Sequence, residues 1–131
     1  FRRPMSRILL AEDDSTMLVF LTKALTRAGH AVAAVDDGLK ALAEVQGGRF
    51  DLLIADIVMP SLDGFQLAAK AKSLQPGLKV MFITGFAAVT LSNRDGMPRA
   101  LREMAGAETL VLSKPFHLKD LVDEVEKVLA A

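Results

Sequence analysis

The sequence predicts an α/β fold in which a five-stranded parallel sheet carries helices on both faces. Short apolar runs alternate along the chain with longer segments of helical periodicity, which is typical of successive βα units. One of the runs, Leu52 to Ala55, is apolar at every position, as expected of a central parallel strand that is buried on both faces. We therefore expect a doubly wound, three-layer sandwich.

Capping residues and glycines bound the predicted helices. Asp14 or Ser15 can cap the first helix, which Gly29 ends, and Asp36 or Asp37 can cap the second. The other expected elements are strands at 8–11, 31–35, 52–55, 79–84 and 110–113, a third helix at about 65–74 and a last helix at 118–129. Residues 86–108 are the hardest to assign, with weak helical character around a turn-forming tract at 92–98.

Length and composition predict one compact domain with a sizeable core. The chain has 131 residues, of which 51% are hydrophobic. Its 16 basic and 16 acidic side chains cancel, so no net positive field attracts nucleic acid or an anionic membrane surface. Cysteine is absent, which excludes disulfides and thiolate metal sites. Any binding specificity must therefore be local.

The ends of the chain and its apolar runs bear on domain limits and location. Residues 1–5 show no periodicity, and we interpret them as tag residues or a disordered lead, which leaves residues 6–131 as the domain. The apolar runs are too short to span a bilayer and do not follow the pattern of a secretion signal. The expected location is the cytoplasm, with no membrane contact.

Polar side chains follow four of the five predicted strands. Glu12 and Asp13 follow the first strand, Asp56 the third, Thr84 ends the fourth, and Lys114 follows the fifth. A doubly wound sheet binds its ligands in the crevice beyond the carboxyl ends of the strands. These side chains are therefore expected to converge at one edge of the sheet.

The predicted cluster has a specific chemistry. Crowded carboxylates repel one another and raise their own pKa values unless a cation neutralises them, and hard oxygen ligands favour Mg²⁺. Beside such an ion, Asp56 is suited to attack a phosphorus atom and form an aspartyl phosphate. Lys114 and the Thr84 hydroxyl are then placed to contact the new phosphoryl oxygens.

Taken singly, each of these residues has an ordinary structural explanation, such as a helix cap, a hydroxyl bonded to backbone or a solvated charge. Pro60 and Gly64 predict turn geometry before a helix, which would fix the loop beside Asp56. The Lys114–Pro115 bond could be cis, because a turn must hold the lysine toward the crevice, but the sequence does not show the isomer. The order and strand placement of the whole set favour a functional site.

These residues together resemble the receiver domains of response regulators (CheY-like) in two-component signalling. Glu12-Asp13-Asp14 resembles the acidic pair of that family, IADIVMPSLDG carries its phosphoacceptor at Asp56, and Ile83-Thr84-Gly85 and Ser113-Lys114-Pro115-Phe116 resemble its threonine and lysine segments. The resemblance covers about residues 6–130. It implies a flavodoxin-like strand order 2-1-3-4-5 and phosphorylation of Asp56 by a histidine kinase or a histidine phosphotransfer protein. It also implies Mg²⁺ held by Asp13, Asp56 and the backbone carbonyl of Val58, with Glu12 acting partly through water.

Two features depart from that family. The position three before the lysine, where receivers commonly carry Tyr or Phe, is Val111, and the chain has no tyrosine. A switch through a rotating ring is therefore in doubt, and coupling is expected to run through Thr84 and the backbone after it. The segment between Thr84 and Lys114 is also longer than usual, which predicts a loop or a remodelled helix on the face that receivers use for partners.

Two apolar positions bear on the lifetime of the phosphorylated state. By the resemblance, Val58 and Phe86 lie beside the phosphoryl group. We expect both to hinder an attacking water and to make self-dephosphorylation slow, the ordinary alternative being that both simply pack. A polar residue in place of Phe86 should then speed hydrolysis.

A narrower resemblance links Lys79–Leu91 and Leu112–Ala131 to the stand-alone CpdR-type receivers of alphaproteobacteria. That group is associated with regulated proteolysis: the unphosphorylated receiver primes the ClpXP protease for certain substrates, and phosphorylation switches it off. The sequence ends directly after its last amphipathic segment, from which we expect no output domain and a signal that leaves through protein contact, from a monomer or weak dimer.

Two other classes of function compete with the switch. A phosphatase with an aspartate nucleophile would need a second acid two positions after Asp56, and Val58 stands there. An interaction module of receiver fold would not need the full set of acids, threonine and lysine. Nucleotide or flavin binding has no supporting motif. The two histidines, His30 and His117, are far apart and indicate no site, and His117 is expected to face solvent.

Overall fold

The computed structural model describes residues 6–84, 110–113 and 116–130, and the side chains of 84 and 110–113 lie outside this description. Its elements are β1 (Arg7–Ala11), α1 (Ser15–Arg27), β2 (Ala31–Val35), α2 (Gly38–Gly47), β3 (Leu52–Asp56), α3 (Gly64–Leu74), β4 (Lys79–Thr84), β5 (Leu110–Ser113) and α6 (Leu118–Ala130). The predictions for residues 1–5, for 86–108 and for the Lys114–Pro115 bond fall outside the described residues.

The five strands form one parallel sheet in the order β2-β1-β3-β4-β5. This confirms the doubly wound, flavodoxin-like topology. The chain crosses from β2 over β1 to reach β3, so β1 and β3 are neighbours in the middle of the sheet. Their carboxyl ends flank the point where the winding reverses, which is where such sheets bind ligands.

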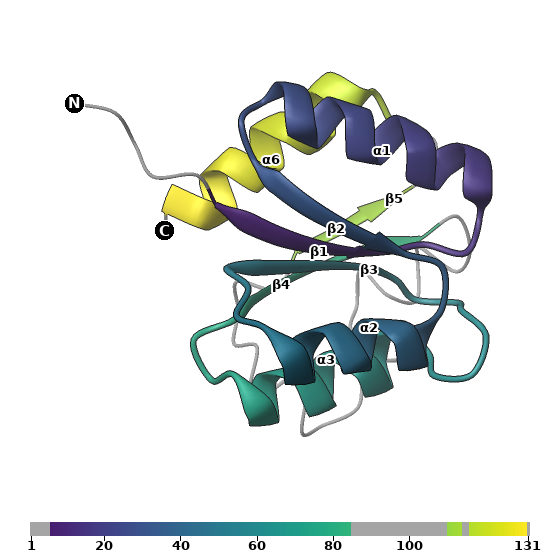
Figure 1. Cartoon of the computed structure of the whole chain (residues 1–131). Helices are drawn as coiled ribbons and strands as arrows, with labels where there is room; N and C mark the ends of the chain where they lie inside the picture. The colour runs from purple at the N-terminus through teal and green to yellow at the C-terminus, as the bar shows by residue number, and fades with distance from the viewer. Residues whose placement is uncertain (1–5, 85–109, 114–115, 131) are drawn as a thin grey trace.

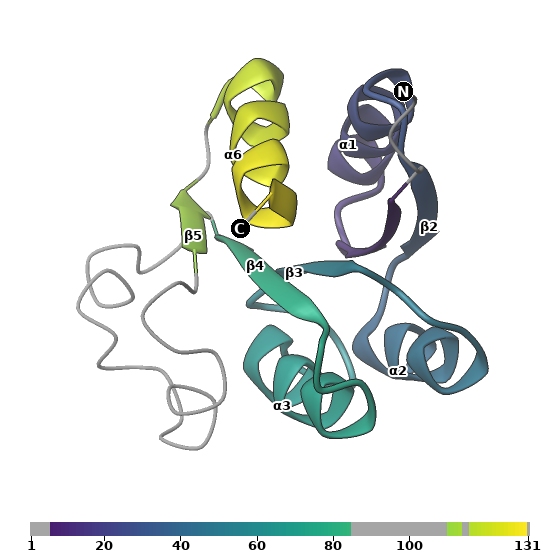
Figure 2. The same ribbon diagram turned by 90° about the vertical axis from the view of Figure 1, so that its left-hand side faces the viewer.

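Helices cover both faces of the sheet. Figure 1 shows α1 and α6 on one face and α2 and α3 on the other, and Figure 2 shows the same layers from the side of the two termini, with β5 at the left edge of the sheet. Alternate residues of each strand point to opposite faces. In β1, for example, Ile8 and Leu10 join the cluster under α1 and α6, whereas Leu9 and Ala11 join the cluster under α2 and α3.

β3 is buried along its whole length. All five of its residues, including Asp56, are buried, which agrees with the continuous apolar run in the sequence. The strand lies between β1 and β4, with Leu53 and Ile54 packing toward opposite helical layers. Asp56 therefore lies at the end of a buried strand in the centre of the sheet.

Aspartate side chains cap three of the helices. The carboxylates of Asp14, Asp37 and Asp63 accept hydrogen bonds from the backbone amides of Met17, Lys40 and Gln66. Each cap satisfies a helical N–H that has no partner within its helix. Of the alternatives predicted for the first two helices, Asp14 and Asp37 are the caps. α3 begins at Gly64, one residue before the predicted start at Phe65.

Among the described residues, no helix is both long enough and apolar enough to cross a membrane.

Candidate functional site

The carboxyl ends of β1 and β3 bring three acids together. Glu12, Asp13 and Asp56 each place a carboxylate oxygen within 4.8 Å of the others. Two of the three come directly after β1 and the third is the last residue of β3, as the strand-end pattern predicts. The structure therefore places these three predicted residues in one cluster.

The burial of the three acids differs. Glu12 is fully buried, Asp56 is 6% exposed, and Asp13 is exposed. Asp13 is thus the member of the cluster that faces solvent, where an ion or a donor molecule would arrive. The two buried acids form the floor of the site.

Backbone amides hold the two buried carboxylates. The amide of Asp14 donates to Glu12 Oε2 at 3.2 Å, and the amide of Val58 donates to Asp56 Oδ1 at 3.1 Å. The Glu12 amide donates in turn to the Val35 carbonyl at the end of β2. Such bonds fix the orientation of the two carboxylates.

The electrostatics of the cluster favour a cation. Three carboxylates within a few ångströms of one another repel, and the repulsion is strong where burial lowers the effective dielectric constant. Carboxylate oxygens are hard ligands of the kind that Mg²⁺ prefers, usually with several waters retained. The donor set and the partial exposure through Asp13 fit a magnesium ion.

The loop between Asp56 and α3 is closed at its base. The Ile57 amide donates to the Ile83 carbonyl of β4 at 3.1 Å, and the Gly64 amide donates to the Ile57 carbonyl at 2.9 Å. A Cβ added at Gly64 would lie 2.5 Å from the Asp56 carbonyl oxygen. The predicted role of Gly64 in fixing the loop is therefore supported, and the physical reason is close approach of two backbones.

The other predicted site residues are placed to different degrees. Thr84 is the last residue of β4 and pairs with Ser113, so its backbone lies at the same edge of the sheet as Asp56, which pairs with Ile83. Val111 lies in β5 opposite Phe82. Val58 is 57% exposed. Phe86 and Lys114 fall outside the described residues, and their predicted roles stay predictions.

The structure adds contacts that the sequence did not indicate. His30 is 8% exposed, and its Nε2 lies 2.8 Å from Glu126 Oε1, which joins the start of β2 to α6. His117 is exposed, as predicted. Gly38 packs against Leu62 in the loop after Asp56. None of these contacts has a local sequence signal, because the partners are far apart along the chain.

The fold and the acidic cluster are compatible with a signalling domain of the doubly wound class, and comparison with known proteins shows the family. The model of the response regulator receiver domain matches residues 8–126. The chain belongs to this family.

Known proteins similar to the chain include single receivers and larger signalling proteins. "Response regulator receiver protein CpdR" of Brucella abortus is 52% identical over 127 residues, which are 97% of this chain and 99% of that protein. "Sensor kinase CckA" of the same species is 33% identical over 93% of this chain but only 12% of its own length. A CheY-like receiver structure from Methanospirillum hungatei superposes with a TM-score of 0.82 at 28% identity, covering 97% of this chain and 95% of its own.

Proposed function

We propose that this receiver is a switch in which Asp56 accepts a phosphoryl group from a phosphohistidine donor. The observation that carries the proposal is the cluster of Glu12, Asp13 and Asp56 at the end of the central strand, with carboxylate oxygens within 4.8 Å of one another. An aspartate in this position serves as an oxygen nucleophile once its negative surroundings are neutralised.

The proposed transfer exchanges the bond between phosphorus and nitrogen in the donor for a bond between phosphorus and an Asp56 oxygen. A carboxylate oxygen of Asp56 forms a bond to phosphorus, the bond between phosphorus and the donor imidazole nitrogen breaks, and the electron pair stays on that nitrogen. The Val58 amide holds Asp56 Oδ1 during the approach. Asp13, Asp56 and the Val58 carbonyl would hold Mg²⁺, with Glu12 partly through water, and the ion would neutralise the charge that develops on the phosphoryl oxygens. The Thr84 hydroxyl and the Lys114 ammonium would bind those oxygens afterwards.

The chemistry proposed for the chain is limited to its own phosphorylation and slow self-dephosphorylation. The family consists of signalling modules, and the position two after Asp56 is the apolar Val58, so no second acid is present there to activate water. Val58 and Phe86 are proposed to hinder hydrolysis. A polar residue at Phe86 is expected to shorten the lifetime of the phosphorylated form.

The proposed partners follow from the two relatives. The similarity to a segment of a protein named a sensor kinase supports a phosphorelay with a histidine kinase or histidine phosphotransfer protein as the donor. The 52% identity to a CpdR protein over almost its whole length supports the output of that group, in which the receiver controls the ClpXP protease in the cytoplasm. We propose that residues 6–131 act as one domain, as a monomer or weak dimer, through a protein surface that changes on phosphorylation.

The proposal is tested by the mass of the intact protein after incubation with acetyl phosphate. We expect the gain of one phosphoryl group in the presence of Mg²⁺, and no gain in EDTA or in Asp56→Ala. Asp63→Ala is the matched control, because it removes a carboxylate from the same loop without touching the cluster. Equal phosphorylation of wild type and Asp56→Ala would contradict the assignment of Asp56 as the acceptor. No gain in wild type would favour a phosphorylation-independent interaction module.

A further inference from the structure

The loop that follows Asp56 carries a strained turn at its tip. Ser61 has φ of 65°, in the left-handed region that non-glycine residues seldom occupy. The amide of Leu62 donates to the carbonyl of Pro60 at 2.7 Å, a bond across one residue as in a γ-turn. A conformation of this kind persists only when its surroundings hold it.

The surroundings that hold the turn belong to the first residues of α2. The Leu39 amide donates to Ser61 Oγ at 3.3 Å, and the Gly38 amide approaches the Pro60 carbonyl at 3.4 Å. The Ser61 side chain also helps to lower the pKa of the Asp37 carboxyl, which caps α2. The start of α2 therefore bonds both the backbone and the side chain of the loop tip.

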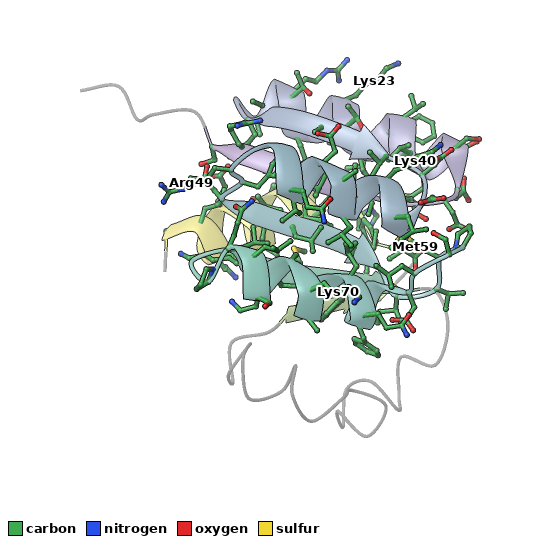
Figure 3. The ribbon with its side chains drawn as sticks, turned by 60° about the horizontal axis from the view of Figure 1, so that its bottom comes forward. Lys23, Lys40, Arg49, Met59 and Lys70 are labelled. Atoms are coloured by element: carbon green, nitrogen blue, oxygen red, sulfur yellow. The ribbon has the colours of Figure 1, made fainter. Side chains whose placement is uncertain are left out.

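Gly38 is the closest point of this contact. A Cβ added there would lie 2.1 Å from the Leu62 carbonyl oxygen and 2.6 Å from the Leu62 Cβ, and backbone atoms cannot yield as a flexible side chain can. Leu62 and Met59 are both 8% exposed and belong to the same core cluster as Ala41 of α2. Figure 3 shows Met59 and Lys40 toward the same end of the molecule, opposite Arg49.

We propose that Gly38 and Ser61 are positioning residues for the metal site, because they fix the loop tip and so fix where the Val58 carbonyl lies. The loop is closed at its base by Gly64 against Ile57 and Asp56. With the base fixed, movement of the tip is taken up by the residues that join the two, which are Val58 and Met59 on one side and Asp63 on the other. This inference rests on the proposed metal site and assigns it a support outside the cluster of acids.

Binding of Mg²⁺ to Gly38→Ala, followed by two-dimensional NMR of the backbone amides, tests the inference. We expect the added Cβ to push the loop tip away, to shift the amide signals of Ile57 and Val58 before any metal is added, and to raise the dissociation constant for Mg²⁺ roughly tenfold, a loss typical of removing a group that orients a metal ligand. Gly47→Ala is the control, because the same change at the other end of α2 meets no atom within 4 Å. It should leave both readouts unchanged.

If Gly38→Ala does not fold, a second variant tests the same inference. Ser61→Gly removes the hydroxyl and tolerates the positive φ, so it loosens the contact without crowding it. It should also raise the dissociation constant. Either folded variant binding Mg²⁺ as tightly as wild type, with only a lowered thermal midpoint, would overturn the inference and leave the metal site intact. Failure of wild type itself to bind Mg²⁺ would overturn the proposed metal site and the inference together.

Discussion

At the scale of single residues, the site depends on how carboxylates are held. Asp56 and Glu12 are buried, and each carboxylate accepts a hydrogen bond from a backbone amide. Asp13 is exposed. A backbone amide also binds the carboxylate of Asp37 nearby. The hydrogen bond from the Lys40 amide lowers the pKa of the Asp37 carboxyl below its ordinary value, with a further contribution from the Ser61 hydroxyl. In the caps and in the site alike, backbone amides bind and orient a carboxylate.

The pKa of Asp37 reports the contact between α2 and the loop tip. Because folding lowers this pKa, the ionised cap stabilises the fold above the ordinary pKa of the unfolded chain, and this contribution is lost as the pH falls through the lower pKa of the folded state. In Ser61→Gly we expect the pKa of Asp37 to rise toward its ordinary value but to stay below it, since the Lys40 amide remains. Carbon NMR titration of the carboxyl signal measures it. An unchanged pKa would show that the Ser61 hydroxyl does not act on the Asp37 carboxyl in solution.

At the scale of elements, α6 is joined to the rest of the molecule by contacts of three kinds. Leu121 and Val125 are fully buried in the cluster that includes Leu21 and Leu25 of α1. Lys79 Nζ donates to the Val128 carbonyl at 2.8 Å, which satisfies a helical carbonyl at the end of α6. The pair of His30 and Glu126 adds a polar contact. The helix is therefore fixed along its whole length.

Truncation of Leu121 should show how much of the stability comes from α6. Leu121→Ala removes a fully buried side chain and is expected to lower the free energy of unfolding by about 2–5 kcal/mol. Leu118→Ala, at a position of the same helix that is 38% exposed, should cost less than about 1 kcal/mol. Urea unfolding followed by far-ultraviolet circular dichroism measures both, since the chain has no tryptophan or tyrosine for fluorescence. Equal losses would mean that α6 is not packed as described.

The elements differ in how far the sequence predicts them. Strands such as Leu52–Asp56 and capped helices such as α1 are local patterns, because hydrophobic periodicity and an aspartate cap lie within a few residues. The pair of His30 and Glu126 joins residues 96 positions apart, and no local pattern indicates it. The close approach of Gly38 to Leu62 is of the same kind. From the sequence alone, Gly38 is only a weak helix former at the start of a helix. Its contact with Leu62 becomes apparent only in the structure.

At the scale of the whole molecule, the convergence of the acids follows from topology. Parallel strands place all their carboxyl ends at one edge, so Glu12, Asp13 and Asp56 meet although 42 or more residues separate the two strand ends in sequence. This part of the site could be predicted from the alternation of strands and helices alone. The strand order is predicted only by the resemblance to receivers, and the structure confirms that prediction. The contact of α2 with the loop after Asp56 depends on how the two pack side by side. The alternation of strands and helices in the sequence does not specify this packing.

The central claim is that Asp56 is the residue that receives the phosphoryl group, and chemical trapping tests it most directly. The protein is treated with acetyl phosphate and Mg²⁺, the acyl phosphate is reduced with borohydride, and the product is digested and sequenced by mass spectrometry. Reduction converts a phosphorylated aspartate to homoserine and leaves free carboxylates unchanged. We predict homoserine at position 56 alone, and none in EDTA. Homoserine at Asp13 or Asp63 with an intact Asp56, or none at any position in protein that has gained a phosphoryl mass, would contradict the account.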